Sequence, residues 1–162
     1  MGLKRLLIAG VPATGKTTVG RYLGSERSFL HIDFEDRSPL WNEFLITNPA
    51  GLIDDFSCHG GDLVVTWGFA PEAHSIRVVK IFKEKGFDLI WFDGNRQAAL
   101  REFLRREGGD TRAFREQLKG IRRARVLEKI RPVVVNTFDP KGRFRDLPAI
   151  AAEVVAAGSG AP

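Results

Sequence analysis

The feature that most constrains how this chain can fold is a glycine-rich segment at residues 10–18, with the sequence GVPATGKTT. Its first eight residues fit the phosphate-loop pattern, which is a glycine, four residues and then Gly-Lys-Thr. An apolar run at residues 6–9 precedes the segment, and apolar residues at helical spacing follow it at Val19, Tyr22 and Leu23. Because a strand, a loop and a helix stand in the required order, the sequence predicts a site for the phosphates of a nucleoside triphosphate.

Each residue type in this loop has a physical task. Gly10 and Gly15 allow backbone angles and a close approach that a side chain would block. The loop N–H groups can then surround phosphate oxygens, and the helix that begins near Lys16 adds its positive end. The Lys16 ammonium can reach the outer phosphates, and the Thr17 hydroxyl can bind Mg²⁺. The predicted nucleotide-binding residues are Gly10, Ala13, Thr14, Gly15, Lys16, Thr17 and Thr18.

The rest of the chain alternates short apolar runs with helical patterns, which is typical of a parallel sheet covered by helices. The apolar runs lie at residues 3–9, 29–34, 63–67, 89–92 and 133–135. Residues 37–62, punctuated by proline and glycine, read as a long irregular connection, and such connections are usually functional in a small domain. The length of 162 residues predicts one domain over residues 1–157, with a disordered tail at 158–162.

The net charge and the cysteine content limit the binding partners and the cellular compartment that we expect for this chain. The chain has 25 Lys and Arg against 20 Asp and Glu, a net charge of +5 that suits a phosphate-rich ligand and also allows nucleic acid. Cys58 is the only cysteine, so it cannot form an intrachain disulfide, and Cys58-His59 lacks a second pair at zinc spacing. No apolar run approaches the roughly 18–20 residues of a membrane span. We expect a cytoplasmic protein without membrane contact, either a monomer or a dimer, with Mg²⁺ as its metal.

With these residues the chain resembles the small P-loop kinases: the nucleoside-monophosphate, shikimate and gluconate kinases, and the related small-molecule and polynucleotide 5′-hydroxyl kinases. The resemblance covers most of the length, is most specific at residues 10–18, and elsewhere rests on the order and spacing of elements. It implies an α/β fold of the three-layer P-loop NTPase type, with a five-stranded parallel sheet in the order 2-3-1-4-5 and helices on both faces. It further implies an acceptor-binding insert at residues 37–62, an arginine-bearing lid at 96–125 and an adenine site near 139–143.

Several kinases of this group carry an aspartate at the end of the second strand, which orients or deprotonates the acceptor hydroxyl or holds Mg²⁺ through water. Asp33 matches that position. A carboxylate within hydrogen-bond distance can take the hydroxyl proton as the phosphoryl group arrives. Ligands also bind at the carboxyl ends of strands in open α/β sheets, although solvated acids are common there. We expect Asp33 to act as base, Mg²⁺ ligand and acceptor contact, with Glu35 as a second acceptor-binding candidate.

The third strand departs from the resemblance. Where nucleotide kinases commonly have Asp-Gly-Phe-Pro, this chain has Trp67, a glycine and Phe69. An acidic Mg²⁺ partner is therefore absent from this strand, and Asp33 or Asp93 would replace it. The aromatic faces of Trp67 and Phe69 either form the floor of the acceptor site or belong to the core.

Nine arginines lie between Arg96 and Arg125, interleaved with acidic residues. Guanidinium groups delivered by a closing segment can offset the charge that spreads over the phosphoryl oxygens during transfer. Most of the nine are expected to be solvated or paired with nearby acids, and Arg105 and Arg112 are the predicted catalytic ones. Asp110 is predicted to cap the helix that carries Arg112.

These observations predict an ATP- and Mg²⁺-dependent kinase that transfers the γ-phosphoryl group to a hydroxyl or phosphate acceptor, with Lys16, Asp33, Arg105 and Arg112 as catalytic residues. A small molecule, nucleoside or nucleotide is the first choice of acceptor, and a polynucleotide 5′-hydroxyl is the second. A nucleotide-dependent ATPase switch with a protein partner is the alternative from another class, and the acid missing at Trp67 gives it some support. The residues leave open the identity of the acceptor and the choice between ATP and GTP.

Overall fold

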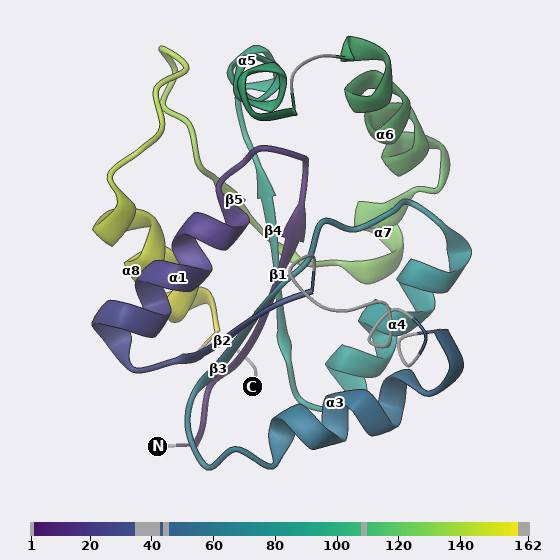
Figure 1. The fold of residues 1–162 in the computed structure, drawn as a ribbon, viewed down its shortest axis with the longest axis vertical. Helices are drawn as coiled ribbons and strands as arrows, with labels where there is room; N and C mark the ends of the chain where they lie inside the picture. The colour runs from purple at the N-terminus through teal and green to yellow at the C-terminus, as the bar shows by residue number, and fades with distance from the viewer. Residues whose placement is uncertain (1, 35–42, 44–45, 108–109, 159–162) are drawn as a thin grey trace.

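A five-stranded parallel sheet forms the centre of the molecule (Figure 1). The computed structural model describes residues 2–34, 43, 46–107 and 110–158. The strands are β1 (Arg5–Gly10), β2 (Leu30–Asp33), β3 (Leu63–Thr66), β4 (Asp88–Asp93) and β5 (Val133–Asn136). Their order is β2-β3-β1-β4-β5 with every neighbouring pair parallel, which confirms the fold class and the strand order that the resemblance implies.

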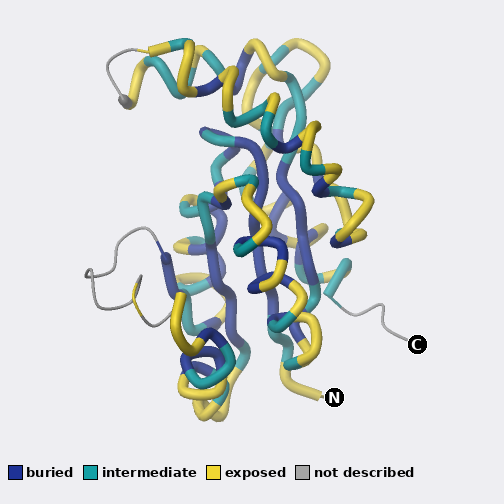
Figure 2. Tube along the Cα trace, turned by 90° about the vertical axis from the view of Figure 1, so that its right-hand side faces the viewer, coloured by how far each residue is buried: buried dark blue, intermediate teal, exposed yellow. Residues whose placement is uncertain are grey.

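Helices cover both faces of this sheet and complete the three layers, as Figures 1 and 2 show. One face carries α1 (Lys16–Arg27) and α8 (Leu147–Ala157), and the other carries α3 (Pro49–Ser57), α4 (Ala73–Glu84) and α7 (Val126–Ile130). Helices α5 (Arg96–Glu107) and α6 (Thr111–Arg123) lie beyond the carboxyl ends of the strands. Within the described ranges, no helix combines the length and apolar character needed to cross a bilayer.

The central strand β1 explains why the sheet is covered on both sides. Leu6 and Ile8 belong to the apolar cluster under α1 and α8, while Leu7 and Ala9 belong to the cluster under α3, α4 and α7. All four residues are at most 4 % exposed, so the strand is apolar throughout, as expected for a parallel strand buried on both faces. The dark central strands in Figure 2 show the same burial. This packing fixes the carboxyl end of β1, from which the phosphate loop departs.

The structure corrects the expectation that residues 37–62 are irregular, because α3 occupies Pro49–Ser57. Asn48 caps this helix by accepting a hydrogen bond from the Gly51 N–H at 3.1 Å, and Pro49 stands in its first turn. Proline at this position is a helix-start signal rather than a breaker, since the first N–H groups of a helix need no intrahelical partner. The side chains of Leu52 and Phe56 anchor the helix in the core. Residues 37–42, 44–45 and 159–162 lie outside the described residues, so the predicted disordered tail is described only at its first residue.

Candidate active site

The loop between β1 and α1 has backbone geometry that requires glycine at its two ends. Gly10 has a φ of 143° and Gly15 a φ of 82°, both in the region that side chains disfavour. A Cβ on Gly10 would lie 2.2 Å from the carbonyl oxygen of Phe92, because β4 passes directly beside the loop. The expected order of strand, glycine-dependent loop and helix is therefore present, with α1 beginning immediately after the loop at Lys16.

Two side chains of the loop are buried and bonded to the loop backbone. Lys16 is 7 % exposed, and its Nζ donates to the carbonyl oxygens of Val11 at 3.0 Å and of Gly10 at 3.5 Å. The Thr14 hydroxyl donates to the same Val11 carbonyl at 2.7 Å. These contacts hold the Lys16 ammonium at the loop, where a positive charge can act on bound phosphate groups.

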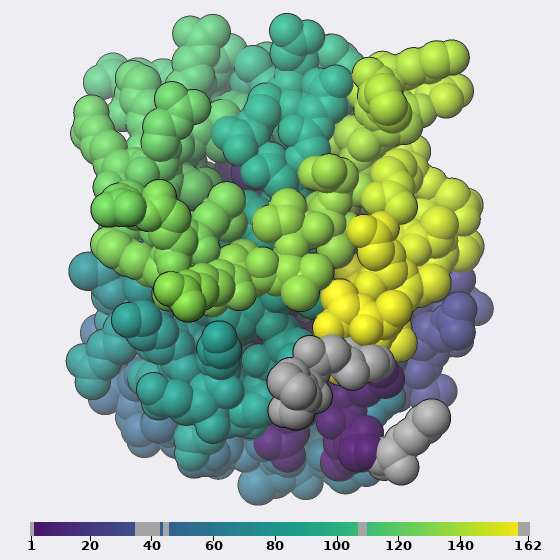
Figure 3. Space-filling view, turned by 180° about the vertical axis from the view of Figure 1, so that it is seen from behind, coloured from purple at the N-terminus to yellow at the C-terminus, as the bar shows by residue number. Residues whose placement is uncertain are grey.

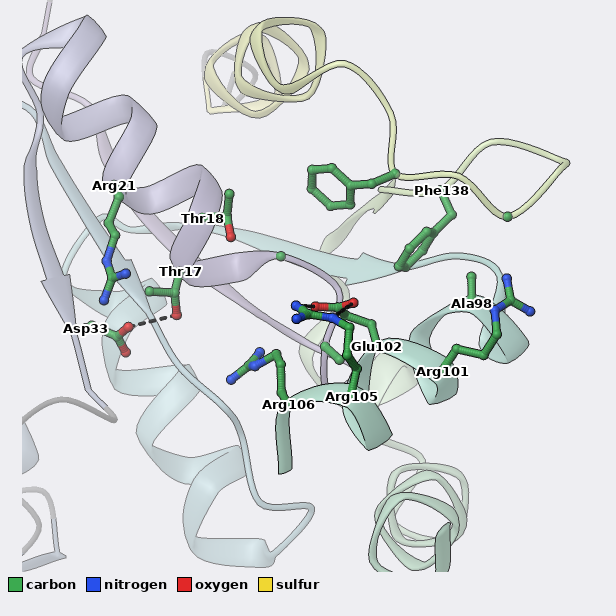
Figure 4. A pocket seen from close by; sticks show the side chains of 14 residues that line it. Thr17, Thr18, Arg21, Asp33, Ala98, Arg101, Glu102, Arg105, Arg106 and Phe138 are labelled. Carbon is green, nitrogen blue, oxygen red and sulfur yellow. Dashed lines mark hydrogen bonds and ion pairs between the residues drawn. The ribbon is translucent and has the colours of Figure 1, made fainter. Parts of the chain in front are cut away.

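Asp33 reaches the phosphate loop from the end of β2 (Figure 4). Its side chain is largely buried, and its Oδ2 accepts a hydrogen bond from the Thr17 hydroxyl at 2.8 Å. The two residues expected to bind Mg²⁺ are thus brought together across 16 positions of sequence. Their oxygens suit Mg²⁺, which commonly binds proteins through one or two such groups and takes its remaining ligands from phosphates and water. Within the described residues, no group of three or more His, Cys, Asp or Glu side chains could form a metal site.

A cleft of about 780 Å³ extends from this pair along the phosphate loop and α5 to the segment after β5. Thr17, Arg21 and Asp33 lie at one end of the cleft, while Ala98 and Phe138 lie at the other (Figure 4). Figure 4 shows the Arg21 guanidinium directed toward the carboxylate of Asp33. The cleft therefore has a polar, charged end beside α1 and an aromatic end beside β5.

A second cavity, of about 340 Å³, lies between the phosphate loop and helix α6. Phe103, Arg106 and Gln117 contribute to its walls, together with residues of the loop. The Gln117 Nε2 donates to the carbonyl oxygens of Gly68 at 3.1 Å and of Phe69 at 3.0 Å, which ties α6 to the segment after β3. This space adjoins Lys16 and Thr17 of the phosphate loop.

The structure distinguishes the arginines of the 96–125 region. Arg105 lines the cleft, but its guanidinium is bound to Glu102 through Nε at 2.9 Å and Nη2 at 2.5 Å. These hydrogen bonds raise the pKa of Arg105 and lower the pKa of Glu102. Arg112 is exposed on α6 and lines neither space. Arg106, which the sequence analysis did not select, lines both.

The aromatic residues after β3 belong to the core side of the molecule. Phe69 is fully buried and packs edge-on against Trp67 and Trp91, with ring centroids 5.5 Å apart in both pairs. Trp67 is half-buried and also packs against Phe34 at 5.9 Å. Neither Trp67 nor Phe69 lines the cleft or the second cavity, Phe69 belongs to the core, and Trp67 packs against the core from its edge. Glu35, the other acceptor-binding candidate, lies outside the described residues.

The hydrogen bonds of Asp93, at the end of β4, give this residue a structural role. Its carboxylate accepts hydrogen bonds from the Gly94 N–H at 2.8 Å and from the Arg96 guanidinium at 3.0 and 2.8 Å. These contacts fix the turn into α5, and Asp93 does not line the cleft. Of the two acids considered as replacements for the one missing at Trp67, Asp33 is the one at the phosphate loop.

The sequence analysis did not predict the two phenylalanines that line the aromatic end of the cleft. Phe138 and Phe144 flank the turn of a hairpin at residues 139–142, and their ring centroids lie 5.8 Å apart at an angle of 82°. Phe144 also covers the phosphate loop, because a Cβ on Gly15 would lie 2.6 Å from two of its ring carbons. Two phenylalanines placed symmetrically around a turn were the available signal, since such positions face each other in a hairpin.

Comparison with known proteins supports the fold. No protein-family model matches the chain, and no curated protein matches it in sequence. A gluconokinase from Sinorhizobium meliloti 1021 is 15 % identical, with a TM-score of 0.62 over 98 % of this chain and 94 % of that chain. A shikimate kinase from Acinetobacter baumannii is 14 % identical, with a TM-score of 0.60 over 94 % and 91 %. The tunicamycin resistance protein of Deinococcus radiodurans is 16 % identical, with a TM-score of 0.65 over 96 % and 95 %. The chain therefore has the fold of the small P-loop kinases.

Proposed function

We propose that this protein is an ATP- and Mg²⁺-dependent kinase that transfers the γ-phosphoryl group to a hydroxyl of a small-molecule acceptor. The observation that carries this proposal is the contact between the Asp33 carboxylate and the Thr17 hydroxyl, 2.8 Å apart at the phosphate loop. A carboxylate at this place can hold Mg²⁺ together with the loop threonine, and in hydroxyl phosphorylation it can also accept the acceptor proton. The small cavity beside the loop favours a small acceptor over a polynucleotide.

Each group of the site has its own role in the proposed reaction. The loop N–H groups and the Lys16 ammonium bind the triphosphate, and Thr17 and Asp33 would hold Mg²⁺. When bound, Mg²⁺ supplies positive charge that neutralises the phosphate oxygens. The acceptor oxygen forms a bond to the γ-phosphorus while the bond to the bridging oxygen of ADP breaks, and the acceptor proton passes to the Asp33 carboxylate.

Arg106 replaces the predicted pair of arginines in this proposal. It lines both the cleft and the second cavity, so its position suits charge on a group that passes between donor and acceptor. Arg105 is bound to Glu102, and Arg112 is exposed and lines neither space. We assign Arg106 to the stabilisation of the phosphoryl group during transfer.

The nucleobase fits the aromatic end of the cleft. Ala98 and Arg101 on α5 form one wall there, and Phe138 and Phe144 form the other. This is the region around residues 139–143 that the resemblance assigns to adenine. A flat base between a guanidinium and aromatic rings is a favourable arrangement, because both partners stack on π faces.

The test is transfer of label from γ-labelled ATP with Mg²⁺ to a pooled set of hydroxyl acceptors. The pool contains sugars, hydroxy acids, amino alcohols, nucleosides, nucleotides and 5′-hydroxyl oligonucleotides. Asp33→Asn should lower transfer by about 10²- to 10⁴-fold, because the variant cannot accept the proton. Asp54→Asn is the matched control, since Asp54 is an exposed carboxylate paired with Lys85 on the far side of the molecule from the loop.

The alternatives make different predictions in the same assay. Release of labelled phosphate that no acceptor changes, and that Asp33→Asn leaves unaltered, would favour the ATPase switch. Label appearing only on oligonucleotides, with a steep salt dependence, would favour the polynucleotide kinase. Lys16→Ala should abolish both binding and turnover, and a Lys16→Ala variant that keeps them would contradict the whole proposal.

A further inference from the structure

Helix α6 carries a glutamine, Gln117, in the middle of its inward-facing side. The buried residues Phe114 and Ile121 lie three positions before it and four positions after it, so all three share one face of the helix. An apolar side chain would fill this place without the cost of desolvating an amide. A glutamine here is therefore expected to serve a polar partner.

The contacts of Gln117 determine which way its carboxamide points. Its Nε2 donates to the carbonyl oxygens of Gly68 at 3.1 Å and of Phe69 at 3.0 Å, which uses both of its N–H groups. The flipped orientation would place Oε1 against two other oxygens, so the two carbonyls exclude it. Among the described residues, Oε1 has no hydrogen-bond partner, and it remains accessible. Since Gln117 lines the second cavity, the atom that it offers to a ligand there is a hydrogen-bond acceptor.

Close packing of α6 against the segment after β3 holds this oxygen in place. A Cβ on Gly120 would lie 2.5 Å from the Cγ of Pro71, so the helix approaches this segment more closely than a side chain would allow. The helix is thus fixed at two points one turn apart, by Gln117 and by Gly120. Figure 3 shows a hollow between α5 (teal) and α6 (green), with purple atoms of the N-terminal part of the chain visible inside it. Because both the helix and the amide are held without a ligand, Oε1 is preorganised for one hydrogen bond.

The other polar side chains of the second cavity differ from Gln117 in what they offer. Lys16 and Arg106 can only donate hydrogen bonds, while the hydroxyls of Thr17 and Thr18 can both donate and accept. Among the side chains that line this cavity in the described part of the chain, Gln117 alone has an oxygen that can only accept. A ligand in the cavity meets this oxygen favourably only with an O–H or N–H group.

We propose that Gln117 is a specificity-determining residue, whose Oε1 accepts a hydrogen bond from a second O–H or N–H group of the acceptor, beside the hydroxyl that is phosphorylated. This inference rests on the proposed function, because it concerns the acceptor of that reaction. A site built to bind a donor group on its substrate rejects the analogue that lacks it, since the protein atom is then left unpaired. A simple monohydric alcohol should therefore be a poor acceptor even where it fits the cavity.

The first experiment compares acceptors on the full chain with γ-labelled ATP and Mg²⁺. The probes are ribose, glucose and glucosamine, each of their monodeoxy analogues, and 1-propanol as the monohydric alcohol. For a probe that takes the label, loss of the group that contacts Gln117 should lower kcat/KM by about 5- to 150-fold. Equal transfer to a labelled probe and to all of its monodeoxy analogues, or to 1-propanol, would overturn the inference. If neither these probes nor the wider acceptor pool took label, the proposed function itself would fail, which separates the two failures.

The second experiment separates acceptor binding from a merely structural role of Gln117. Gln117→Lys can still donate to the carbonyls of Gly68 and Phe69 but cannot accept a hydrogen bond, whereas Gln117→Met can do neither. Both variants should raise KM for the acceptor by about 5- to 150-fold at unchanged nucleotide affinity, and the penalty for the deoxy analogue should disappear in both. Gln97→Lys is the matched control, because Gln97 is an exposed glutamine of α5 that lines neither space.

A purely structural role would give a different pattern. Gln117→Lys would then keep the acceptor KM of the unaltered protein while Gln117→Met alone lost activity, and this result would overturn the inference. Thermal unfolding shows whether each variant folds. Should Gln117→Met fail to fold, Gln117→Lys and the deoxy analogues still decide, because a deoxy penalty that persists in Gln117→Lys would place the contact on another residue.

Discussion

Helix α1 contains two glycines one turn apart, Gly20 and Gly24, for which the structure predicts opposite effects of the same substitution. A Cβ on Gly24 would make only ordinary contacts, 3.5 Å from the His31 Cβ and from the Phe29 carbonyl oxygen. A Cβ on Gly20 would lie 2.3 Å from the His31 Nε2 and 2.8 Å from the Thr66 Cγ2. These two side chains are themselves joined by a hydrogen bond of 2.9 Å between the imidazole and the threonine hydroxyl.

The magnitudes follow from these contacts. Gly24→Ala should stabilise the protein by about 0.5–1 kcal/mol, because alanine restricts the unfolded chain and favours the helix. Gly20→Ala gains the same amount but must displace the His31 ring from the fully buried Thr66, which costs about 1–3 kcal/mol for the stranded hydroxyl. Crowding of the packed interface adds about 1–3 kcal/mol. The net effect is a loss of about 1–5 kcal/mol.

Thermal unfolding followed by circular dichroism can separate the two variants. In a chain of this length, 1 kcal/mol shifts Tm by about 2–4 °C, so Gly24→Ala should melt above the unaltered protein and Gly20→Ala well below it. Combining Gly20→Ala with His31→Ala removes the closest contact. The double variant should therefore lose less stability than the two single variants lose together. A Gly20→Ala variant as stable as Gly24→Ala would refute the packing described around α1.

Two further predictions concern the donor end of the cleft. Gly15→Ala should abolish nucleotide binding while the chain still folds, because the new methyl group would clash with the Phe144 ring and alanine disfavours the left-handed backbone at this position. Binding measured by competition with a fluorescent ATP analogue checks this, and unchanged affinity would contradict the geometry. Hydrogen bonds from the Arg143 N–H and side chain lower the pKa of Asp139 below its usual 3.8, so its contribution to the hairpin is complete above that pH and is lost only as the pH falls through the lowered value. A carboxyl NMR titration checks this, and a midpoint at or above 3.8 would contradict it.

The parts of the fold that depend on backbone constraints could be predicted from the sequence. The phosphate loop was identified because its chemistry needs glycine at fixed positions, and both glycines have the positive φ that this requires. The Asp110 cap was predictable for the same reason, and its Oδ1 accepts the Arg112 N–H at 2.7 Å. Helix α3 was missed although Asn48 and Pro49 signal a helix start, because the proline and glycine content of the segment was read as irregular.

The sequence could not identify the arginine of the site as reliably, because long side chains on neighbouring turns can reach several partners. Arg105 and Arg106 are adjacent in sequence, and Glu102 forms an ion pair with Arg105 at 2.5 Å. The spacing of three between Glu102 and Arg105 was visible in the sequence and indicates such a pair. What the sequence could not show is that Arg106 lines two adjoining spaces, since this depends on how α5 packs against the phosphate loop.

The donor and acceptor sides that we propose for this site are built by different means, and the difference bears on how the acceptor can be identified. The donor side consists of the phosphate loop and the hairpin, which are joined where Phe144 covers Gly15 and are held by backbone hydrogen bonds. The proposed acceptor side is the second cavity, where side chains of α5 and α6 face the phosphate loop, and Gln117 fastens α6 to the segment after β3. Gln117 lines only the second cavity of the two spaces, whereas Arg106 lines both, so we expect Gln117→Ala to alter acceptor binding more than nucleotide binding and Arg106→Ala to alter both. Nucleotide affinity reports on the first unit and acceptor preference on the second, so the two can be assigned independently.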